Sequence, residues 1–520
     1  MSRSLAGVLA AAALLAGAAR AADAPEHHHD HPAPERLGTV RFATSCSPKV
    51  QARFDRAVAL LHSFTYGPAR QAFGEVAQAD PHCAMAFWGE AMSRYHQLWE
   101  PPDADELRQG AAEIGKAAAI GGTPRERAYI AALSQYYADA EHAPPAVGAQ
   151  RYSDAMAGVA RDNPADTEAQ VFYALSLIAT AAPTDRTHAN QKRAVAILAP
   201  LWKKQPRHPG LAHYLIHAND SAEMAPQGLA AARAYAKIAP SAPHALHMPS
   251  HIFTRLGLWR DSVASNQAAR AAAKAQGDVG EELHAMDYLT YADLQLGRVA
   301  DARKVAAQAK AMSGLEAAQF KVGYAANAMA VRVAVETKDW PAAASLQPLP
   351  GTAPRVAAIV YWARALGRSR ADPGASADDD IAALRACRDQ LRAAGDAYWA
   401  AQADVLLLSA QGWALHRNGD QAGAIVALRD AAQAEDGLEK LPVTPGPIVP
   451  AREQLGELLL GLHRPGEALA QFKLALVQSP GRRGALAGAL AAAKDGGNLE
   501  DIKQYRRALE GGGEKPERRR

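Results

Sequence analysis

Histidines gather in one stretch of this 520-residue chain: five of its 18 histidines lie between residues 213 and 251. Two pairs, His213 with His217 and His247 with His251, are four residues apart, which places both members of a pair on one face of a helix. Neutral imidazoles bind Zn, Cu, Fe or Ni, and an i,i+4 pair can place two nitrogens on one ion. The pattern therefore predicts a site for a divalent transition metal.

The spacing between the pairs supports one shared site. Positions 213 and 247 are 34 residues apart, as are 217 and 251, which predicts equivalent places on neighbouring helices, with the four imidazoles converging on one point. The full set of candidate ligands is His213, His217, His244, His247, His251 and Asp287. Pro249 argues against a regular helix, because proline kinks a helix interior and disfavours the α conformation of the residue before it. The alternative is that these histidines cap helices, bond to backbone carbonyls or line a groove for an anionic or peptide ligand.

Composition predicts the elements that must position these side chains. Alanine is the most frequent residue and has the highest helix propensity, while aromatic residues make up only 6% of the chain. We therefore expect an all-α fold. The 57 Lys and Arg residues nearly balance the 54 Asp and Glu residues, and the net charge of +3 argues against a nucleic-acid partner. The sequence contains no phosphate-binding loop, dinucleotide-binding, HExxH zinc-protease or GxSxG hydrolase motif.

Helical repeats form a second pattern. A 34-residue hairpin spacing is carried near the two ends of the chain by Leu455, Gly456, Ala468, Phe472, Ala475 and Pro480, and by Ala69, Phe73 and Pro81. Over roughly residues 45–510 the chain thus resembles the tetratricopeptide repeat (TPR) family. Segments such as His213-Tyr-Leu-Ile-His217 also resemble a group of uncharacterised exported bacterial repeat proteins. The resemblance implies an α-solenoid, a right-handed superhelix of TPR-like helical hairpins, that binds a peptide or protein in its concave groove.

The same resemblance implies positions for the histidines. Counted back from Gly257 as the turn between two helices, His244, His247 and His251 take places that line the concave groove in TPR proteins. Counting from Gly297 gives the same places to His284, Asp287 and Tyr291. His62 and His96, which are also 34 residues apart, are possible groove residues, although we favour a packed aromatic seam in which they bond to backbone.

Breaks in the helical pattern predict the domain organisation. Residues 1–21 combine a basic start, a short apolar run and a small-residue cleavage signal, which together are typical of a Sec-type signal peptide cleaved near Ala21 and Ala22. We therefore expect a periplasmic or secreted protein without a membrane span. The further blocks are a disordered His- and Pro-rich tail at 22–44, a TPR-like block with the histidines at 45–340, an irregular connection at 341–380, a TPR block at 381–510 and a disordered tail at 511–520.

The chain has three cysteines, Cys46, Cys83 and Cys387. An oxidising compartment permits a disulfide, and Cys46 with Cys83 is the nearest pair. Closing a loop of this length would stabilise the fold by roughly 3–4 kcal/mol in the loop-entropy model. The alternative is three buried thiols.

These observations favour an exported TPR-like solenoid that binds a peptide, protein or other ligand on its concave face, with the histidines as a metal-dependent part of that surface. One alternative is a metal-dependent enzyme that uses the histidine cluster, and a second is a purely structural scaffold of a periplasmic assembly. The coordination sphere of the metal would distinguish the enzyme from the binding protein, because a catalytic metal keeps an open position beside a pocket.

Overall fold

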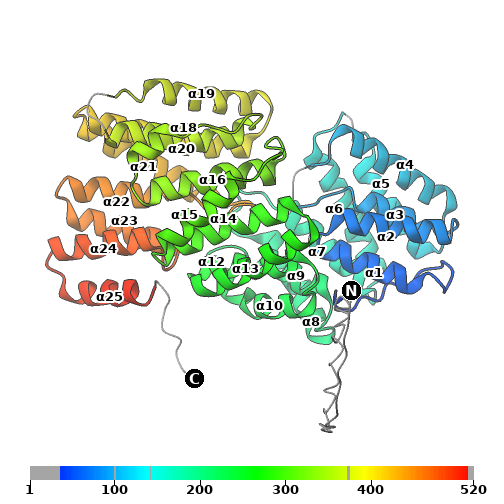
Figure 1. Ribbon diagram of the computed structural model, residues 1–520. Coiled ribbons are helices and arrows are strands. Elements are labelled where there is room, and N and C mark those ends of the chain that lie inside the picture. Colours follow the sequence, from blue (N-terminus) through cyan, green and yellow to red (C-terminus); the bar gives the residue numbers. More distant parts are fainter. Residues whose placement is uncertain (1–34, 99–100, 141, 372–374, 513–520) are drawn as a thin grey trace, which may run out of the picture. The chain divides into compact units, whose positions relative to one another are not determined.

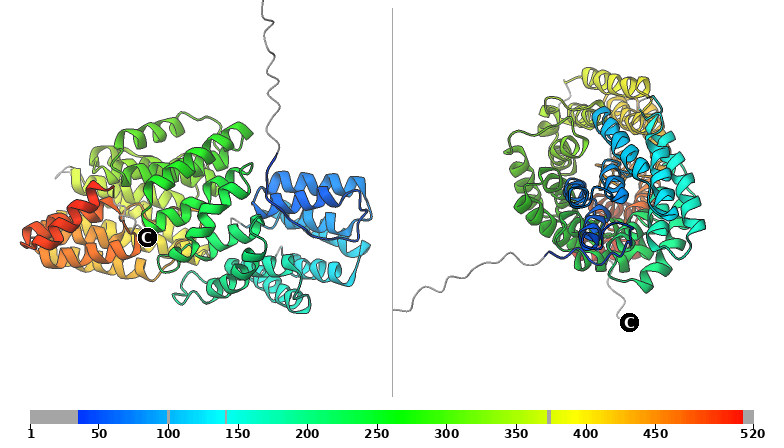
Figure 2. Two further views of the ribbon diagram at one scale, coloured as in Figure 1. Left: turned by 90° about the horizontal axis from the view of Figure 1, so that it is seen from below. Right: turned by 90° about the vertical axis from the view of Figure 1, so that its right-hand side faces the viewer.

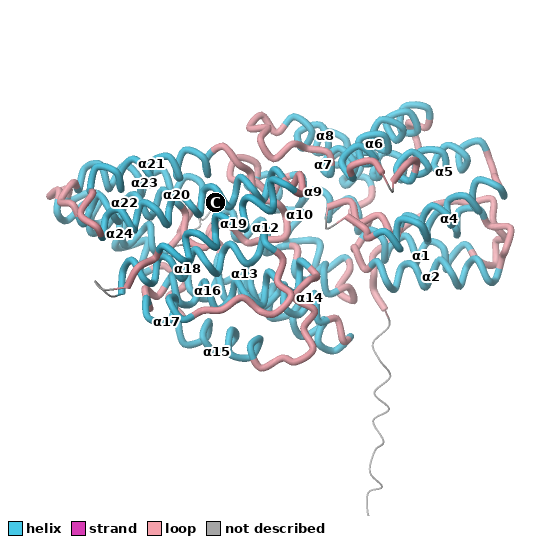
Figure 3. Tube along the Cα trace, turned by 90° about the horizontal axis from the view of Figure 1, so that it is seen from above, coloured by secondary structure: helices cyan, strands magenta, loops and turns pink. Residues whose placement is uncertain are grey.

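The computed structural model describes residues 35–98, 101–140, 142–371 and 375–512, and every regular element in these ranges is a helix (Figure 3). The predicted all-α fold of helical hairpins is confirmed. The expected signal peptide and residues 513–520 lie outside the described ranges. Within the part of the chain that is described, no helix combines the length and the apolar character needed to cross a bilayer.

Twenty-five helices follow one another along the described ranges (Figure 1). Those before the histidine-rich stretch are α1 (Gln51–His62), α2 (Tyr66–Ala79), α3 (Ala84–Met92), α4 (Ala104–Ile120), α5 (Pro124–Tyr137), α6 (Pro145–Asp162), α7 (Thr167–Ala179) and α8 (Ala189–Lys204). Those that carry or flank the histidines are α9 (Pro209–Ala218), α10 (Ala225–Ile238), α11 (Pro243–His247), α12 (Pro249–Leu256), α13 (Trp259–Gln276) and α14 (Val279–Gln295). The others are α15 (Val299–Lys310), α16 (Phe320–Glu336), α17 (Trp340–Ser345), α18 (Pro354–Ala371), α19 (Asp378–Ala393), α20 (Ala397–Arg417), α21 (Gln421–Asp436), α22 (Ala451–Gly461), α23 (Pro465–Gln478), α24 (Arg483–Asp495) and α25 (Leu499–Glu510).

Local sequence signals fix the ends of these helices. Thr123 begins α5 with a capping box: its hydroxyl accepts from the Glu126 N–H, and the Glu126 carboxylate accepts from the Thr123 N–H. Gly257 and Gly277 end α12 and α13 in the left-handed conformation, with φ of 70° and 72°. Such stops set the length of each hairpin and therefore the place of each side chain along it.

Consecutive helices lie side by side (Figure 2). Small residues on one helix of a pair leave room for bulky residues on the other. A Cβ added at Gly89 would lie 2.3 Å from the Phe73 ring, and one added at Gly456 would lie 2.8 Å from the Phe472 ring. Phe472 also occupies the space beside Gly488, where a Cβ would meet it at 2.3 Å. The glycine and phenylalanine spacing seen in the sequence therefore corresponds to direct contacts between paired helices.

Most buried apolar side chains gather in three clusters, which span residues 37–253, 259–329 and 320–505. Helices α9 and α12 contribute to the first cluster, and α14 contributes to the second. The histidine-rich helices therefore lie where the first two clusters meet.

Two segments that the sequence assigns to disordered or irregular regions are packed. Within residues 36–44, Phe42 is fully buried against the first cluster. Within the expected connection at 341–380, helix α18 spans 18 residues and buries Trp362. The neighbouring prolines and polar residues conceal these buried residues, which number eleven in α18.

The C-terminal hairpins contact the histidine-rich region. Helix α24 packs against α14. The indole Nε1 of Trp259 donates to the Gly481 carbonyl over 3.0 Å, and the buried Arg482 guanidinium donates to the Tyr291 hydroxyl over 3.2 Å. These contacts join residues about 190 to 220 positions apart, a separation that no repeat-to-neighbour packing would produce.

Candidate metal centre

Four helices position the candidate ligands: α9 carries His213 and His217, α11 carries His244 and His247, α12 carries His251, and α14 carries His284. Pro249 is the first residue of α12, where its missing N–H costs no hydrogen bond. Contrary to the expected bias, Met248 keeps α-helical dihedrals, with φ −52° and ψ −35°. The break at proline therefore leaves His247 and His251 close enough for their Nε2 atoms to lie 3.0 Å apart.

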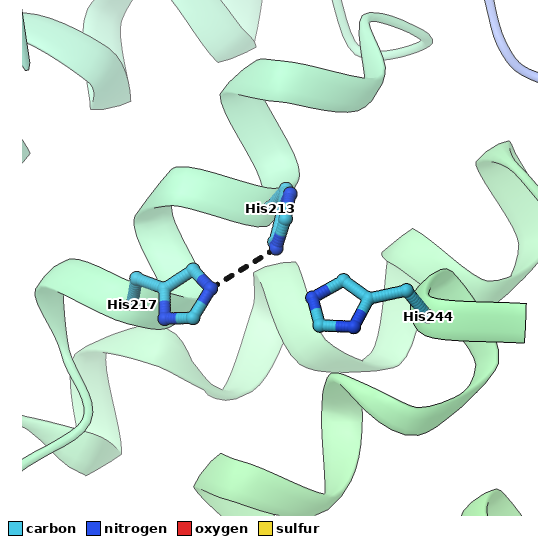
Figure 4. Close-up of side chains that lie close together, drawn as sticks. All are labelled: His213, His217 and His244. Atoms are coloured by element: carbon cyan, nitrogen blue, oxygen red, sulfur yellow. Dashed lines mark hydrogen bonds between the residues drawn. The ribbon is translucent and has the colours of Figure 1, made fainter. Parts of the chain in front are cut away.

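The histidines form two groups of three. We call His213, His217 and His244 the first triad, and His247, His251 and His284 the second triad. In each triad, one ring nitrogen from every residue lies within 4.8 Å of the other two. Figure 4 shows the three rings of the first triad turned toward one another from α9 and α11. Both predicted i,i+4 pairs are present. A third histidine from another helix joins each pair, so the histidines form two groups of three and not the single group of four that the spacing predicts.

Hydrogen bonds determine the tautomers of the second triad. His247 Nδ1 lies 2.7 Å from Asn266 Oδ1, and the Asn266 amide nitrogen donates to the Ser262 carbonyl over 2.8 Å. The oxygen facing His247 is therefore an acceptor, so Nδ1 of His247 is the donor. His251 Nδ1 lies 2.9 Å from Asp220 Oδ2, a carboxylate oxygen, and must also donate. Both neutral rings consequently carry a lone pair on Nε2, and the Tyr288 hydroxyl lies 3.4 Å from the Nε2 of His251.

These two unprotonated nitrogens face each other at 3.0 Å inside the protein. Two lone pairs at that distance repel unless a proton or a metal cation lies between them. Burial disfavours the proton: it lowers the pKa of His247 well below its usual value and that of His251 to about 4. Two nitrogens bound to one ion at about 2.0–2.1 Å, at tetrahedral or square angles, lie about 2.8–3.4 Å apart, which matches the observed separation.

In the first triad the hydrogen bonds fix the tautomer of one of the two facing rings, that of His213. His213 Nδ1 donates to the His62 carbonyl over 2.6 Å, so its Nε2 carries a lone pair, 3.1 Å from His217 Nε2. His244 Nδ1 faces the Glu281 carboxylate at 3.4 Å, which directs its Nε2 away from that carboxylate. Burial lowers the pKa of His213 and of His217 well below the usual value, so both rings are neutral at pH 7.

Asp220 connects the second triad to the loop at residues 437–450, which joins α21 to α22. Its Oδ2 accepts from His251 and binds Lys440 Nζ at 2.7 Å, while its Oδ1 accepts from Arg255 Nε at 3.0 Å. Burial alone would raise the pKa of Asp220, but the charges of Lys440 and Arg255 hold it well below its usual value. The carboxylate behind His251 is therefore ionised, and the 437–450 loop is tied to it.

A third group of ligand-type residues, His62, Glu168 and His208, lies outside both triads. Both imidazoles place Nε2 at 2.8 Å from the Glu168 carboxylate, so both of these nitrogens are donors. Their Nδ1 atoms accept, from the Tyr214 hydroxyl at 3.0 Å and from the Leu211 N–H at 3.2 Å. Every ring nitrogen is matched without an ion, and we assign this group a structural role. The ring of His62 therefore bonds to two side chains, and not to backbone, the bond that the sequence favoured.

Three other residues named from the sequence lie away from the triads. Asp287 was a candidate ligand, but its carboxylate accepts from the buried Arg332 Nε over 2.8 Å and belongs to neither triad. Tyr291 accepts from Arg482. His96 stacks on Tyr66 at 4.3 Å between ring centroids and lines a separate cavity of about 810 Å³.

The expected exposure of the histidines on an open groove is not observed. All six triad residues are buried, with exposed fractions of 5% or less. The 437–450 loop covers one side, where the Tyr288 hydroxyl donates to the Thr444 carbonyl over 3.1 Å, and Phe64 packs on the first triad, 4.4 Å from His213 between ring centroids. His217 borders a cavity of about 210 Å³. The predicted peptide or protein ligand of the concave face stays a prediction.

Several side chains that support the triads were not found from the sequence: Asp220, Asn266, Glu281 and Tyr288. Glu168 and His208 of the structural group were also missed. Two of them carry a usable spacing signal. Asp220 follows His217 by three residues, and Tyr288 follows His284 by four, so each lies on or next to a ligand-bearing helix face. The others depend on contacts between separate hairpins.

A disulfide joins Cys46 to Cys83, the pair chosen from the sequence, and Cys387 is a buried free thiol. The bond ties the segment that precedes α1 to the start of α3. It lies in the first apolar cluster and contributes no ligand to either triad.

No protein-family model matches this chain, and no curated protein sequence matches it. Several solved structures are similar. A human IFIT1 dimer with m7Gppp-AAAA is 12% identical, with 82% of this chain and 90% of that chain covered and a TM-score of 0.37. The APC/C hetero-tetramer Cut9-Hcn1 is 12% identical, with 87% and 78% covered and a TM-score of 0.36. The P58(IPK) TPR domain is 11% identical, with 88% and 99% covered and a TM-score of 0.21. At these levels the similarities say nothing of this chain's ligands.

Proposed function

We propose that this chain is a metal-binding protein whose buried histidine cluster holds a transition-metal ion. The second triad carries the proposal. His247 and His251 direct two Nε2 lone pairs at each other over 3.0 Å, while Asn266 and Asp220 hold their Nδ1–H groups. A cation between the two nitrogens removes the repulsion, and His284 supplies a third imidazole. Donation of the second ring N–H to a carboxylate or amide oxygen is the usual support of a metal-bound histidine.

The donor set indicates which ions fit. Three neutral imidazoles, without a thiolate or carboxylate in the triad, suit Zn²⁺ or copper and exclude the oxygen-preferring Mg²⁺ and Ca²⁺. Fe and Ni, which also accept imidazole, are weaker candidates for a site with no carboxylate ligand. The Asp220 carboxylate behind His251 increases the basicity of that ring and so strengthens its bond to a cation.

A catalytic role is a second candidate, because a pocket reaches the cluster. Three protein ligands leave the fourth position of a tetrahedral ion for water or substrate. His217, Asp220 and Lys440 border the cavity of about 210 Å³. A small molecule in that cavity would lie beside His217 of the first triad and beside Asp220, which supports His251, so a Lewis-acid or metal-hydroxide reaction would receive its substrate from that side.

Metal retention by the purified full-length chain tests the proposal. The sequence also contains His27, His28, His29 and His31, so all variants are built in a background with these four changed to alanine. The chain is stripped with a chelator, loaded with Zn²⁺ or Cu²⁺, passed through a desalting column and analysed for bound metal. We expect metal to be retained after desalting. Failure to retain Zn²⁺, Cu²⁺, Co²⁺, Ni²⁺ or Fe²⁺ would contradict the proposal.

Two substitutions locate the ion. His251→Ala removes one facing nitrogen and should release the metal of the second triad, with the helical circular dichroism signal nearly unchanged. His142→Ala is the matched control, because His142 is exposed, its ring pairs with the nearby Asp139 and it belongs to neither triad. Retention of the same amount of metal by His251→Ala and by His142→Ala would show that the ion binds elsewhere.

A further inference from the structure

We infer that the first triad binds a second ion beside the first, so that the six histidines form a two-metal centre. The inference rests on the proposed function at the second triad and extends it. It replaces the single four-histidine point expected from the sequence with two adjacent sites of three imidazoles each, the first drawn from α9 and α11 and the second from α11, α12 and α14.

The first triad offers a complete ligand set of its own. His213 Nε2 is a bare lone pair, because its Nδ1–H is given to the His62 carbonyl. His217 Nε2 lies 3.1 Å from it, within the range of about 2.8–3.4 Å for two nitrogens on one ion. His217 Nδ1 has no hydrogen-bond partner among the described residues, although the side chain is 95% buried. His244 directs Nδ1 to Glu281 and completes the group.

The two triads are contiguous. Within them, ring centroids are 4.2–6.5 Å apart. Between them, His217 lies 5.8 Å from His251, and His244 lies 6.1 Å from His247, also between ring centroids. The distances between rings of different triads thus fall within the range of distances between rings of one triad. Two ions bound in the two triads would therefore be neighbours. Paired ions that share a substrate or bridging ligand in proteins have this kind of adjacency.

Charge is arranged symmetrically behind the two triads. Asp220 supports His251 in the second triad, and Glu281 faces His244 in the first. Glu281 Oε1 also binds the Lys321 ammonium at 2.6 Å, as Asp220 binds Lys440. Each triad therefore has one lysine-paired carboxylate next to one of its histidines, and no carboxylate inside it. By contrast, the group around Glu168 places a carboxylate directly on its imidazoles and leaves no nitrogen free for an ion.

The cavity beside His217 gives the pair of ions an approach from outside the triads. It is bordered by Asp220, Lys440 and His188 as well as by His217. The walls carry Asp185, Asp220 and Glu439, and Lys440 is paired with Asp220, so they suit a small polar molecule, which would meet His217 of the first triad. Two neighbouring cations would attract a small anion able to bridge or cap them, and azide is a suitable probe for that ligand class.

Stoichiometry separates this inference from the proposed function. Titration of stripped protein with Co²⁺, followed by its visible absorption and by metal analysis after desalting, should reach two equivalents. No bound metal would defeat the proposed function itself. One equivalent, in parent protein that otherwise retains metal, would overturn the two-metal inference and leave the proposed function standing.

Triad-specific variants give the second test. His217→Gln should lower the content from two equivalents to one, and His251→Gln should do the same from the other triad. Loss of all metal in both variants would indicate one shared site and would overturn the inference. The His142→Gln control should keep two equivalents.

Electron paramagnetic resonance of the parent protein is independent of any variant. Two equivalents of Cu²⁺ should give a half-field transition or a loss of signal through coupling, and azide should change that spectrum. The uncoupled spectrum of isolated Cu²⁺ at two equivalents would overturn the placement of the two ions side by side.

Discussion

The carboxylate of Asp220 accepts the Nδ1–H of His251 at 2.9 Å, and the same oxygen binds the ammonium of Lys440 at 2.7 Å. One buried side chain thus orients a candidate metal ligand and anchors the 437–450 loop over it. Because His251 belongs to the second triad, the two tasks are coupled: the group that makes His251 a better ligand also closes that side of the cluster.

Asp220→Asn should weaken metal binding by about 10–100-fold, the usual cost of losing such a supporting group. The amide keeps an acceptor for His251 but loses the negative charge that strengthens the ring as a ligand. Competition with a chromophoric chelator measures the affinity. Asp404→Asn is the control, because Asp404 on α20 pairs with Arg388 and Arg392 of α19 and belongs to neither triad. Equal affinities in the two variants would show that Asp220 does not support the site.

Glu168→Gln should leave the metal content unchanged and destabilise the fold by about 1.5–3 kcal/mol, the range for hydrogen bonds to charged groups. The amide nitrogen would face the Nε2–H of His62 or His208, so a donor would meet a donor in a buried position. Urea unfolding and metal analysis on the same sample check both parts. A drop in metal content with intact folding would mean that this group, too, binds an ion.

Glu435 gives a pH dependence that does not involve the metal centre. Burial raises its pKa to about 7, while its carboxylate accepts from the Ala451 N–H over 2.8 Å. Between the unfolded value near 4.5 and about 7, the folded state binds more protons than the unfolded state. Its contribution to stability is therefore complete below about pH 4.5 and is lost as the pH rises through 7.

Glu435→Gln removes this titration. Relative to the parent, the variant should gain roughly 1–3 kcal/mol of unfolding free energy between about pH 4.5 and about pH 8. Urea unfolding at several pH values measures the gain, with the exposed Glu467→Gln as the control. A difference from the parent that does not change with pH would contradict the raised pKa.

The fold was predictable from the sequence because its signals are local. Alanine content and the Gly456 to Phe472 spacing report contacts between adjacent helices, and these contacts form as expected. The packing of the segments around Phe42 and Trp362 was not predictable from the breaks in the helical pattern, because Phe42 and the buried face of α18 pack against other parts of the chain.

The candidate site was predictable in part for the same reason. A separation of 34 residues identified the pairs at 213 and 247, since it reflects the repeat itself. The division into two triads depends on how helices α9, α11 and α14 cross, which the spacing does not contain. The sequence did not indicate that the histidines are buried, because the 437–450 loop that covers them lies far along the chain and reaches them through Lys440 and Thr444.

Reduction of the Cys46–Cys83 disulfide should lower the unfolding free energy by roughly 3–4 kcal/mol, because the 37-residue separation is a large loop to leave open in the unfolded chain. Cys83→Ala should reproduce the loss, and a reducing agent should then have no further effect. The buried free thiol provides the control, since Cys387→Ala should leave the response to reductant unchanged. Identical urea midpoints with and without reductant would argue against the bond.

Two glycines test whether the C-terminal hairpins contact the histidine-rich region. Gly257 and Gly277 both end helices in the left-handed conformation, with φ of 70° and 72°. A Cβ at Gly257 would lie 2.3 Å from the Pro480 carbonyl oxygen, whereas a Cβ at Gly277 would have nothing within 4 Å. The two glycines therefore share a backbone conformation and differ in whether an added Cβ would meet a neighbouring atom.

Gly277→Ala should cost about 1–2 kcal/mol, the penalty of a left-handed non-glycine residue. Gly257→Ala should cost about 1–3 kcal/mol more, because a backbone carbonyl must also move away. Urea unfolding of both variants measures the difference. The tryptophan fluorescence of Gly257→Ala should also change, since the Trp259 indole donates to the Gly481 carbonyl beside Pro480. Equal losses of stability with unchanged fluorescence would show that the Pro480 carbonyl does not contact the end of α12.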